Sequence, residues 1–177
     1  MGRHARTIAG ALRRRRVPGR RRDRGVGRLI AMSLPIVILD TNALLDWRVF
    51  KDPAAHPLAA LLDSRQVRWL ASPAMQTEWG HVWPRSVFAP WHPDPALTTT
   101  VFEHAEMVDE PPRGPLKCKD PDDQVFIDLA LHVKARWLFT KDAALLKLAR
   151  RARLQGVSVI SLQKWVASGA AIDTPLA

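Results

Sequence analysis

"LPIVILD", residues 34–40, decides the fold class. The stretch is apolar and rich in β-branched side chains until it ends at an aspartate. Such a run predicts a strand buried on both faces, which is typical of parallel sheets. Similar apolar runs predict three further strands, at residues 67–72, 136–140 and 157–162.

Helical patterns separate these strands. Strands that alternate with helices predict a parallel sheet with both faces covered. The sequence therefore predicts a three-layer α/β/α domain with a central parallel β-sheet over residues 32–168, followed by a flexible tail at 169–177. The expected helices are residues 56–66, 72–83, 96–108, about 121 to 134, and 142–153, with one or two closing turns at 162–168.

Length and composition narrow the class of protein. The 177 residues suit one ordinary domain, and nearly half of them are apolar. The single cysteine, Cys118, excludes an internal disulfide framework and suits a reducing, cytoplasmic location. No apolar run approaches the roughly 20 residues of a membrane span, so we expect no membrane association.

The net charge of +10 is concentrated in one segment. Residues 1–32 hold eleven Arg and one Asp, whereas residues 33–177 hold sixteen basic and sixteen acidic residues. Residues 1–31 lack apolar periodicity, which predicts a disordered Arg-rich leader. The leader could be a nucleic-acid-binding arm or a targeting segment. The interpretation that we favour is a mis-assigned start, with translation beginning at Met32.

Acidic residues follow the predicted strands and begin one of the helices. Asp40 follows the first strand, and Asp142 lies two residues beyond the strand at 136–140. Asp120, Asp122 and Asp123 lie in "KCKDPDDQVFIDLALH" (117–132), at the expected start of the helix that leads back to that strand. Since the carboxyl ends of parallel strands meet at one rim of a sheet, these carboxylates are expected to converge there.

A sixth acid lies within reach of the same rim. Glu78 is about one and a half turns into the helix that follows the second strand. Each acid alone also has a simpler interpretation. Asp40, Asp120 and Asp142 could cap helices, Asp122 and Asp123 could complement a helix dipole, and Glu78 could be an exposed helix residue.

Carboxylates crowded into one site repel each other and take up protons with raised pKa values unless a cation compensates them. Hard oxygen ligands favour Mg²⁺ or Mn²⁺. Such an ion activates water and stabilises charge on a phosphoryl oxygen, which predicts phosphodiester hydrolysis. Within the helix-start cluster, Asp123 lies above the apolar stripe of the helix and is assigned to the metal. Asp120 is assigned to capping, and Asp122 to the dipole or an outer contact.

Four segments resemble, in order, the acidic motifs of the PIN domain. They are "VILDTNALLD", "SPAMQTEW", "KDPDDQVFIDLAL" and "LFTKDAALL", and the resemblance covers residues 34 to about 166. It implies Asp40, Glu78, Asp123 and Asp142 as the catalytic, metal-binding acids, with Thr41, Asn42 and Thr140 in support.

PIN domains are metal-dependent nucleases, and many small ones are the toxin ribonucleases of bacterial type II toxin–antitoxin pairs. The resemblance therefore implies an RNA substrate, products with a 5′-phosphate and a 3′-hydroxyl, and a cognate antitoxin partner. Lys141 departs from the family, which often has a small residue there; it could contact phosphate or point into solvent. Lys147, Arg150 and Arg151 share a helix face and could contact RNA or be merely solvated.

Other interpretations remain open. The seven tryptophans are expected to lie mainly in the core, although Trp47 and Trp83 flank expected loops and could belong to an antitoxin surface or a homodimer surface. An aspartyl-nucleophile phosphatase would also carry Asp after its first strand, but Asn42 occupies the place of its second Asp. A catalytically silent PIN fold that binds RNA or protein is the non-enzymatic alternative.

Overall fold

The computed structural model describes residues 34–83 and 85–169. The expected leader at 1–31, and the expected tail beyond residue 169, lie outside these residues. The strands are β1 (Ile36–Leu39), β2 (Arg68–Ala71), β3 (Ala105–Met107), β4 (Trp137–Phe139) and β5 (Ser158–Ile160). They form one all-parallel sheet in the order β3-β2-β1-β4-β5, as expected of a three-layer fold.

Helices fill the connections between the strands. The α-helices are α1 (Thr41–Leu44), α2 (His56–Asp63), α3 (Pro73–Val82), α4 (Leu97–Thr100), α5 (Gln124–His132), α6 (Ala143–Leu146), α7 (Ala149–Arg153) and α8 (Leu162–Ala167). A π-helix, η1 (Leu45–Val49), continues α1, and two 3-10 helices are η2 (Pro53–Ala55) and η3 (Ser86–Trp91). No helix among the described residues has the length and apolarity needed to cross a membrane.

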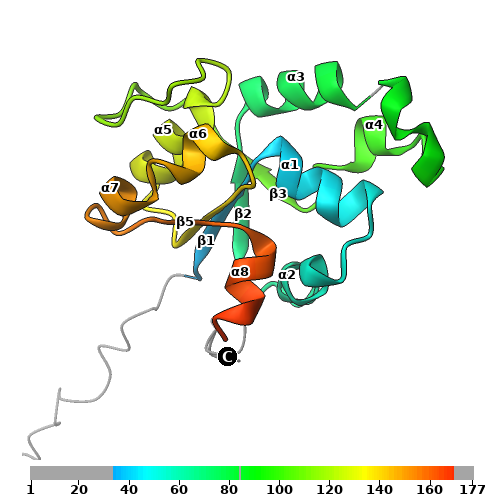
Figure 1. Ribbon diagram of the computed structural model, residues 1–177, viewed down its shortest axis with the longest axis horizontal. Helices are drawn as coiled ribbons and strands as arrows, with labels where there is room; N and C mark the ends of the chain where they lie inside the picture. Colours follow the sequence, from blue (N-terminus) through cyan, green and yellow to red (C-terminus); the bar gives the residue numbers. More distant parts are fainter. Residues whose placement is uncertain (1–33, 84, 170–177) are drawn as a thin grey trace, which may run out of the picture. The chain divides into compact units, whose positions relative to one another are not determined.

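Alternation along the central strand separates two hydrophobic cores. Val37 and Leu39 of β1 join a core that includes α2 and α8, whereas Ile38 joins a core that includes α5 and α7. Figure 1 shows α5 and α7 on one side of the sheet and α2 and α8 on the other. The continuous apolar run of β1 is thus buried on both faces, which confirms the predicted three-layer class.

The expected helix at residues 96–108 is largely wrong. α4 spans only Leu97–Thr100, and Ala105–Met107 instead forms the edge strand β3, paired with β2. The segment "AEM" carries no β-branched residue, so its local preference gave no strand signal. Pairing with the exposed edge of β2 overrides that preference.

One further expected helix is broken, and the structure decides between the two interpretations of the tryptophans. The expected helix at 142–153 is split, because Lys147 ends α6 and Leu148 precedes α7. Trp83 is not a surface residue: it is buried and stacks on Trp79 with ring centroids 5.4 Å apart. Trp47 is half-buried against Trp69. These tryptophans therefore belong mainly to the core.

Candidate metal-dependent nuclease site

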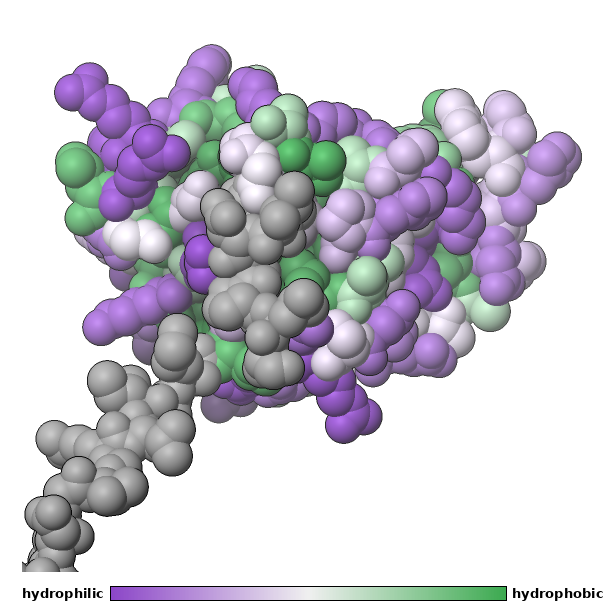
Figure 2. Space-filling model, turned by 90° about the horizontal axis from the view of Figure 1, so that it is seen from below, coloured by the Kyte–Doolittle hydropathy of each residue, from purple (hydrophilic) through white to green (hydrophobic). Residues whose placement is uncertain are grey.

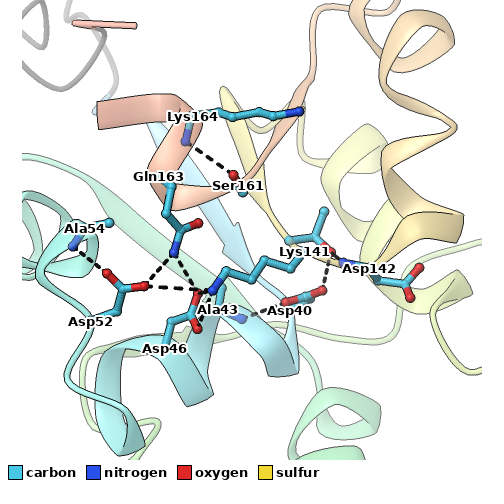
Figure 3. A network of polar contacts seen from close by, with 11 residues as sticks. Asp40, Ala43, Asp46, Asp52, Ala54, Lys141, Asp142, Ser161, Gln163 and Lys164 are labelled. Atoms are coloured by element: carbon cyan, nitrogen blue, oxygen red, sulfur yellow. Dashed lines mark hydrogen bonds and ion pairs between the residues drawn. The ribbon is translucent and has the colours of Figure 1, made fainter. Parts of the chain in front are cut away.

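Asp40 and Thr140 meet where two neighbouring strands end. Leu39 of β1 is in register with Phe139 of β4, so the residues that follow each strand lie side by side. The Asp40 amide donates to the Phe139 carbonyl at 3.0 Å, and Thr140 Oγ1 donates a hydrogen bond to Asp40 Oδ2. Figure 3 shows Asp40 beside Asp142. The predicted rim of the sheet therefore brings together residues 100 positions apart.

Asp40 is almost fully buried, with 1% of its surface exposed. Its Oδ1 accepts a hydrogen bond from the Ala43 amide at 2.8 Å, so it also caps α1. Burial raises the pKa of Asp40 to about 7, and the nearby charge of Glu78 adds to this, although hydrogen bonds from Thr140, Ala43 and Asn42 oppose it. Capping and membership of the carboxylate site are thus compatible roles.

Glu78 reaches the rim from α3. Thr41 Oγ1 donates to Glu78 Oε1 at 2.8 Å, and Glu78 Oε2 is buried without a hydrogen-bond partner. Burial raises the pKa of Glu78, and the charges of Asp122 and Asp120 raise it further. A buried carboxylate oxygen without a partner is costly unless a cation or proton compensates it. The simpler interpretation of Glu78 as an exposed helix residue is therefore wrong.

Asp123 and Asp142 are direct neighbours at the starts of two helices. Asp142 Oδ1 caps α6 by accepting from the amides of Ala144 and Leu145, and its own amide donates to Thr140 Oγ1 at 2.8 Å. Burial raises the pKa of Asp123 to about 7, with further contributions from the charge of Asp142, a hydrogen bond to it, and the charges of Asp120 and Asp40.

The helix after this cluster begins later than expected. α5 starts at Gln124, with Asp123 in the N-cap position, rather than at Pro121 with Asp120 as cap. Asp120 Oδ1 instead accepts from the Asp122 amide at 3.1 Å, which stabilises a turn before the helix. The assignment of Asp120 to helix capping is wrong. Asp120 and Asp122 are exposed and act on the site through their charge.

Lys141 forms an ion pair instead of pointing freely into solvent. Its Nζ lies 2.7 Å from Asp46 Oδ2 and 3.9 Å from Asp52 Oδ2. Gln163 from α8 donates to Asp52 Oδ2 at 2.6 Å and approaches Asp46 Oδ2 at 3.4 Å. Figure 3 shows these side chains converging beside Asp40. The network ties the segment that carries Thr140 and Asp142 to η1 and α8.

The remaining predicted RNA contacts lie outside this cluster. Lys147, Arg150 and Arg151 are exposed on α6 and α7, beyond Asp142 along the chain. The break between the two helices removes the regular i, i+3, i+4 face expected for them.

Sequence reasoning missed two anchors of the site. Gln124 is buried and bonds the Leu116 carbonyl, the Cys118 amide and Asp128, which holds the preceding loop onto α5. The sequence contains a signal for this contact, because the polar residues Gln124 and Asp128 lie four positions apart in a mostly apolar helix.

The second anchor is Glu110, whose side chain caps the start of α3. Glu110 Oε1 accepts from the Ala74 amide at 2.6 Å, and Ser72 Oγ donates to Glu110 Oε2 at 2.9 Å. Ser72 occupies the N-cap position of α3 without a capping bond of its own. No local signal pointed to Glu110, because it lies 36 residues beyond Ala74.

The donor set suits a hard divalent cation. Asp40, Glu78, Asp123 and Asp142 present only carboxylate oxygens, and one of those oxygens is buried without a partner. Among the described residues, no three acids, histidines or cysteines are already clustered tightly enough to hold an ion. A bound ion would therefore draw these side chains together from their present hydrogen bonds.

Comparison with known proteins identifies the family of the chain. Among curated proteins, no sequence gives a significant match. The sequence model of the PIN-domain family matches residues 36–144, a span that includes all four carboxylates of the rim. Proteins of this family are usually nucleases. Together with the all-parallel sheet and its acidic rim, this match shows that the chain belongs to the PIN-domain family.

Proposed function

We propose that the protein is a Mg²⁺- or Mn²⁺-dependent endoribonuclease. The observation that carries this proposal is the meeting of Asp40, Glu78, Asp123 and Asp142 at one rim of the sheet, with Glu78 Oε2 buried and unpaired. A bound divalent cation would activate water and stabilise charge on the phosphoryl group there. The family match supports nuclease chemistry.

The chain's own side chains orient these acids. Thr140 Oγ1 donates to Asp40 and accepts from the Asp142 amide, so one hydroxyl fixes two acids relative to each other. Thr41 holds Oε1 of Glu78. These hydrogen bonds limit how far the acids must move when an ion binds.

Cleavage assays on the purified full chain test the proposal. We expect single-stranded RNA to be cut internally in Mg²⁺ or Mn²⁺ and left intact in chelator, with Asp123→Asn inactive. Internal cutting should give fragments with 5′-phosphate and 3′-hydroxyl ends. If RNA is bound but is not cut under any metal condition, the proposed enzymatic activity is overturned. That result would favour a catalytically silent RNA-binding module.

We further infer a biological role as the toxin of a toxin–antitoxin pair. The support is the size of the domain and the motif resemblance, which is similar to that of small PIN toxins. Expression of the chain should arrest bacterial growth, and Asp123→Asn should not. Co-expression with a small protein encoded beside it should restore growth; growth unaffected by the active chain would contradict the role.

A further inference from the structure

The charge of the folded domain is unevenly distributed along its sequence. Residues 134–164 contain eight basic residues and one acidic residue, Asp142. Residues 94–123 contain eight acidic and three basic residues. The zero balance of the domain therefore conceals a basic segment and an acidic segment. The basic segment attracts a polyanion that reaches the site, and the acidic segment repels it.

The basic segment runs through the site itself. Asp142 caps α6, and the chain runs from it through α6 and α7 to β5. Figure 1 shows α6 and α7 on the opposite side of the domain from α3 and α4, and Figure 2 shows hydrophilic side chains projecting on that side. We define the basic tract as the four exposed residues Lys147, Arg150, Arg151 and Arg153.

These cations are available to a ligand. Of the eight basic residues in 134–164, only Lys141 forms an ion pair within the described part of the chain. Arg150 and Arg153, with Ser158 of the edge strand β5, line an open cavity of about 310 Å³. Two guanidinium groups beside a hydroxyl form a donor set that matches phosphate oxygens.

We propose that the basic tract, with Arg150 and Arg153 at its centre, binds the sugar–phosphate backbone of single-stranded RNA that extends from the cleavage site across α6 and α7. The inference rests on the proposed ribonuclease function and adds the path that the RNA follows away from the cleavage site. RNA leaves the carboxylate rim over α6 and α7, because beyond Asp142 these helices carry exposed cations and no further acidic residue. Phosphate contacts of this kind position the substrate without reading its sequence.

Binding of a fluorescent single-stranded RNA to the full chain, in chelator so that no cleavage occurs, tests the proposal. Each phosphate contact contributes about 0.7 to the slope of log affinity against log salt for a single strand. Arg150→Glu with Arg153→Glu should therefore weaken binding and lower the slope by about 1.4. Arg150→Lys with Arg153→Lys should keep most of the slope, which shows that charge and not folding is responsible.

Lys51→Glu with Arg85→Glu is the matched control. Both residues are exposed and lie outside the tract, and the pair changes net charge by the same amount. An unchanged slope in this control supports the proposal. The proposal is overturned if the slope falls equally in the two Glu double variants. It is also overturned if the slope does not fall when Arg150 and Arg153 are both replaced by Glu. A parallel cleavage assay with Mg²⁺ tests the ribonuclease function separately from RNA binding by the basic tract. Failure of the wild-type chain to cut RNA counts against the ribonuclease function. The salt slopes alone show whether the basic tract binds RNA.

Discussion

Lys141 and Asp46 form an ion pair at 2.7 Å although 95 residues separate them in the sequence. The carboxylate side chain of Asp46 is 5% exposed and the side chain of Lys141 is 43% exposed, so the pair is half-buried. It joins η1 to the connection between β4 and α6, which carries Thr140 and Asp142. Lys141 is therefore a candidate positioning residue for the carboxylate site.

Lys141→Met should lower stability and activity together. Its removal leaves Asp46 with only the long contact from Gln163, at an expected cost of about 1–3 kcal/mol, between the values for exposed and buried pairs. We expect kcat for RNA cleavage to fall about tenfold with KM little changed, because substrate binding is not altered. Urea unfolding and steady-state kinetics measure the two effects.

Two variants separate positioning from general destabilisation. Lys141→Arg should restore kcat, since it can still reach Asp46. Lys134→Met removes an exposed lysine before the other end of β4 and should change neither the free energy of unfolding nor kcat. A Lys141→Met enzyme with wild-type kcat would show that the ion pair only stabilises the fold.

The metal-free protein should lose stability as pH rises. The pKa values of Asp40 and Asp123 are raised from 3.8 to about 7 in the folded state. Unfolded aspartates release their protons near pH 4, whereas these two retain them until about pH 7. The free energy of unfolding should therefore decrease between about pH 4 and pH 7 and level off above it. Thermal melts in chelator should show a lower Tm at pH 8 than at pH 5.

Metal should reverse this trend. Mg²⁺ or Mn²⁺ binds deprotonated carboxylates, so millimolar ion should raise Tm more at pH 8 than at pH 5. Asp123→Asn removes one of the carboxyl groups with a raised pKa and should reduce both the pH dependence and the rise of Tm with metal. If the wild-type Tm is indifferent to metal at pH 8, these carboxylates do not form a cation site.

Thr140→Val should impair cleavage more than it impairs folding. The hydroxyl donates to Asp40 and accepts from the Asp142 amide, and valine has the same shape without these bonds. Losing a side chain that orients metal-site acids typically costs about 10–100-fold in activity. Cleavage rates at saturating Mg²⁺ should show that loss, and Thr140→Ser should recover most of it. Similar rates in the Val and Ser variants would contradict the orienting role.

Substitutions of Asp123 and Asp120, near the start of α5, should differ in their effects on RNA cleavage. Asp123→Asn should reduce cleavage by at least about 100-fold, the upper end of the cost of losing a supporting partner. Asp120→Asn should retain most activity, because Asp120 is exposed and bonds only within its turn. Melting temperatures measured beside the rates distinguish inactive variants from unfolded ones. Inactivity of Asp120→Asn with activity of Asp123→Asn would move the site to the preceding turn.

Gln124→Ala should be strongly destabilising. Its amide group satisfies the Leu116 carbonyl, the Cys118 amide and Asp128 inside the protein, and each buried polar group left unpaired costs about 1–3 kcal/mol. We expect a loss of at least about 2 kcal/mol in urea unfolding. Gln155→Ala, at an exposed glutamine, is the control and should change stability by less than about 0.5 kcal/mol. Equal effects would mean that the buried network is not formed in solution.

Local patterns in the sequence determined the class of fold and the place of the site. The unbroken apolar run of β1 can be satisfied only between two layers, and a parallel strand delivers the residue that follows it to a common rim. Asp40 and Asp142 were predictable for this reason. β3 was not, because "AEM" has little strand preference of its own and becomes a strand only by pairing with β2.

Tertiary structure alone decided which side chains hold the site. Thr140 reaches Asp40, Lys141 reaches Asp46 and Glu110 caps α3 across 100, 95 and 36 residues of sequence. Hydrophobic periodicity specifies which face of an element is buried, but it does not specify which polar atom lies opposite. That choice depends on strand register and on the paths of the connecting loops, which are set only when the layers pack together.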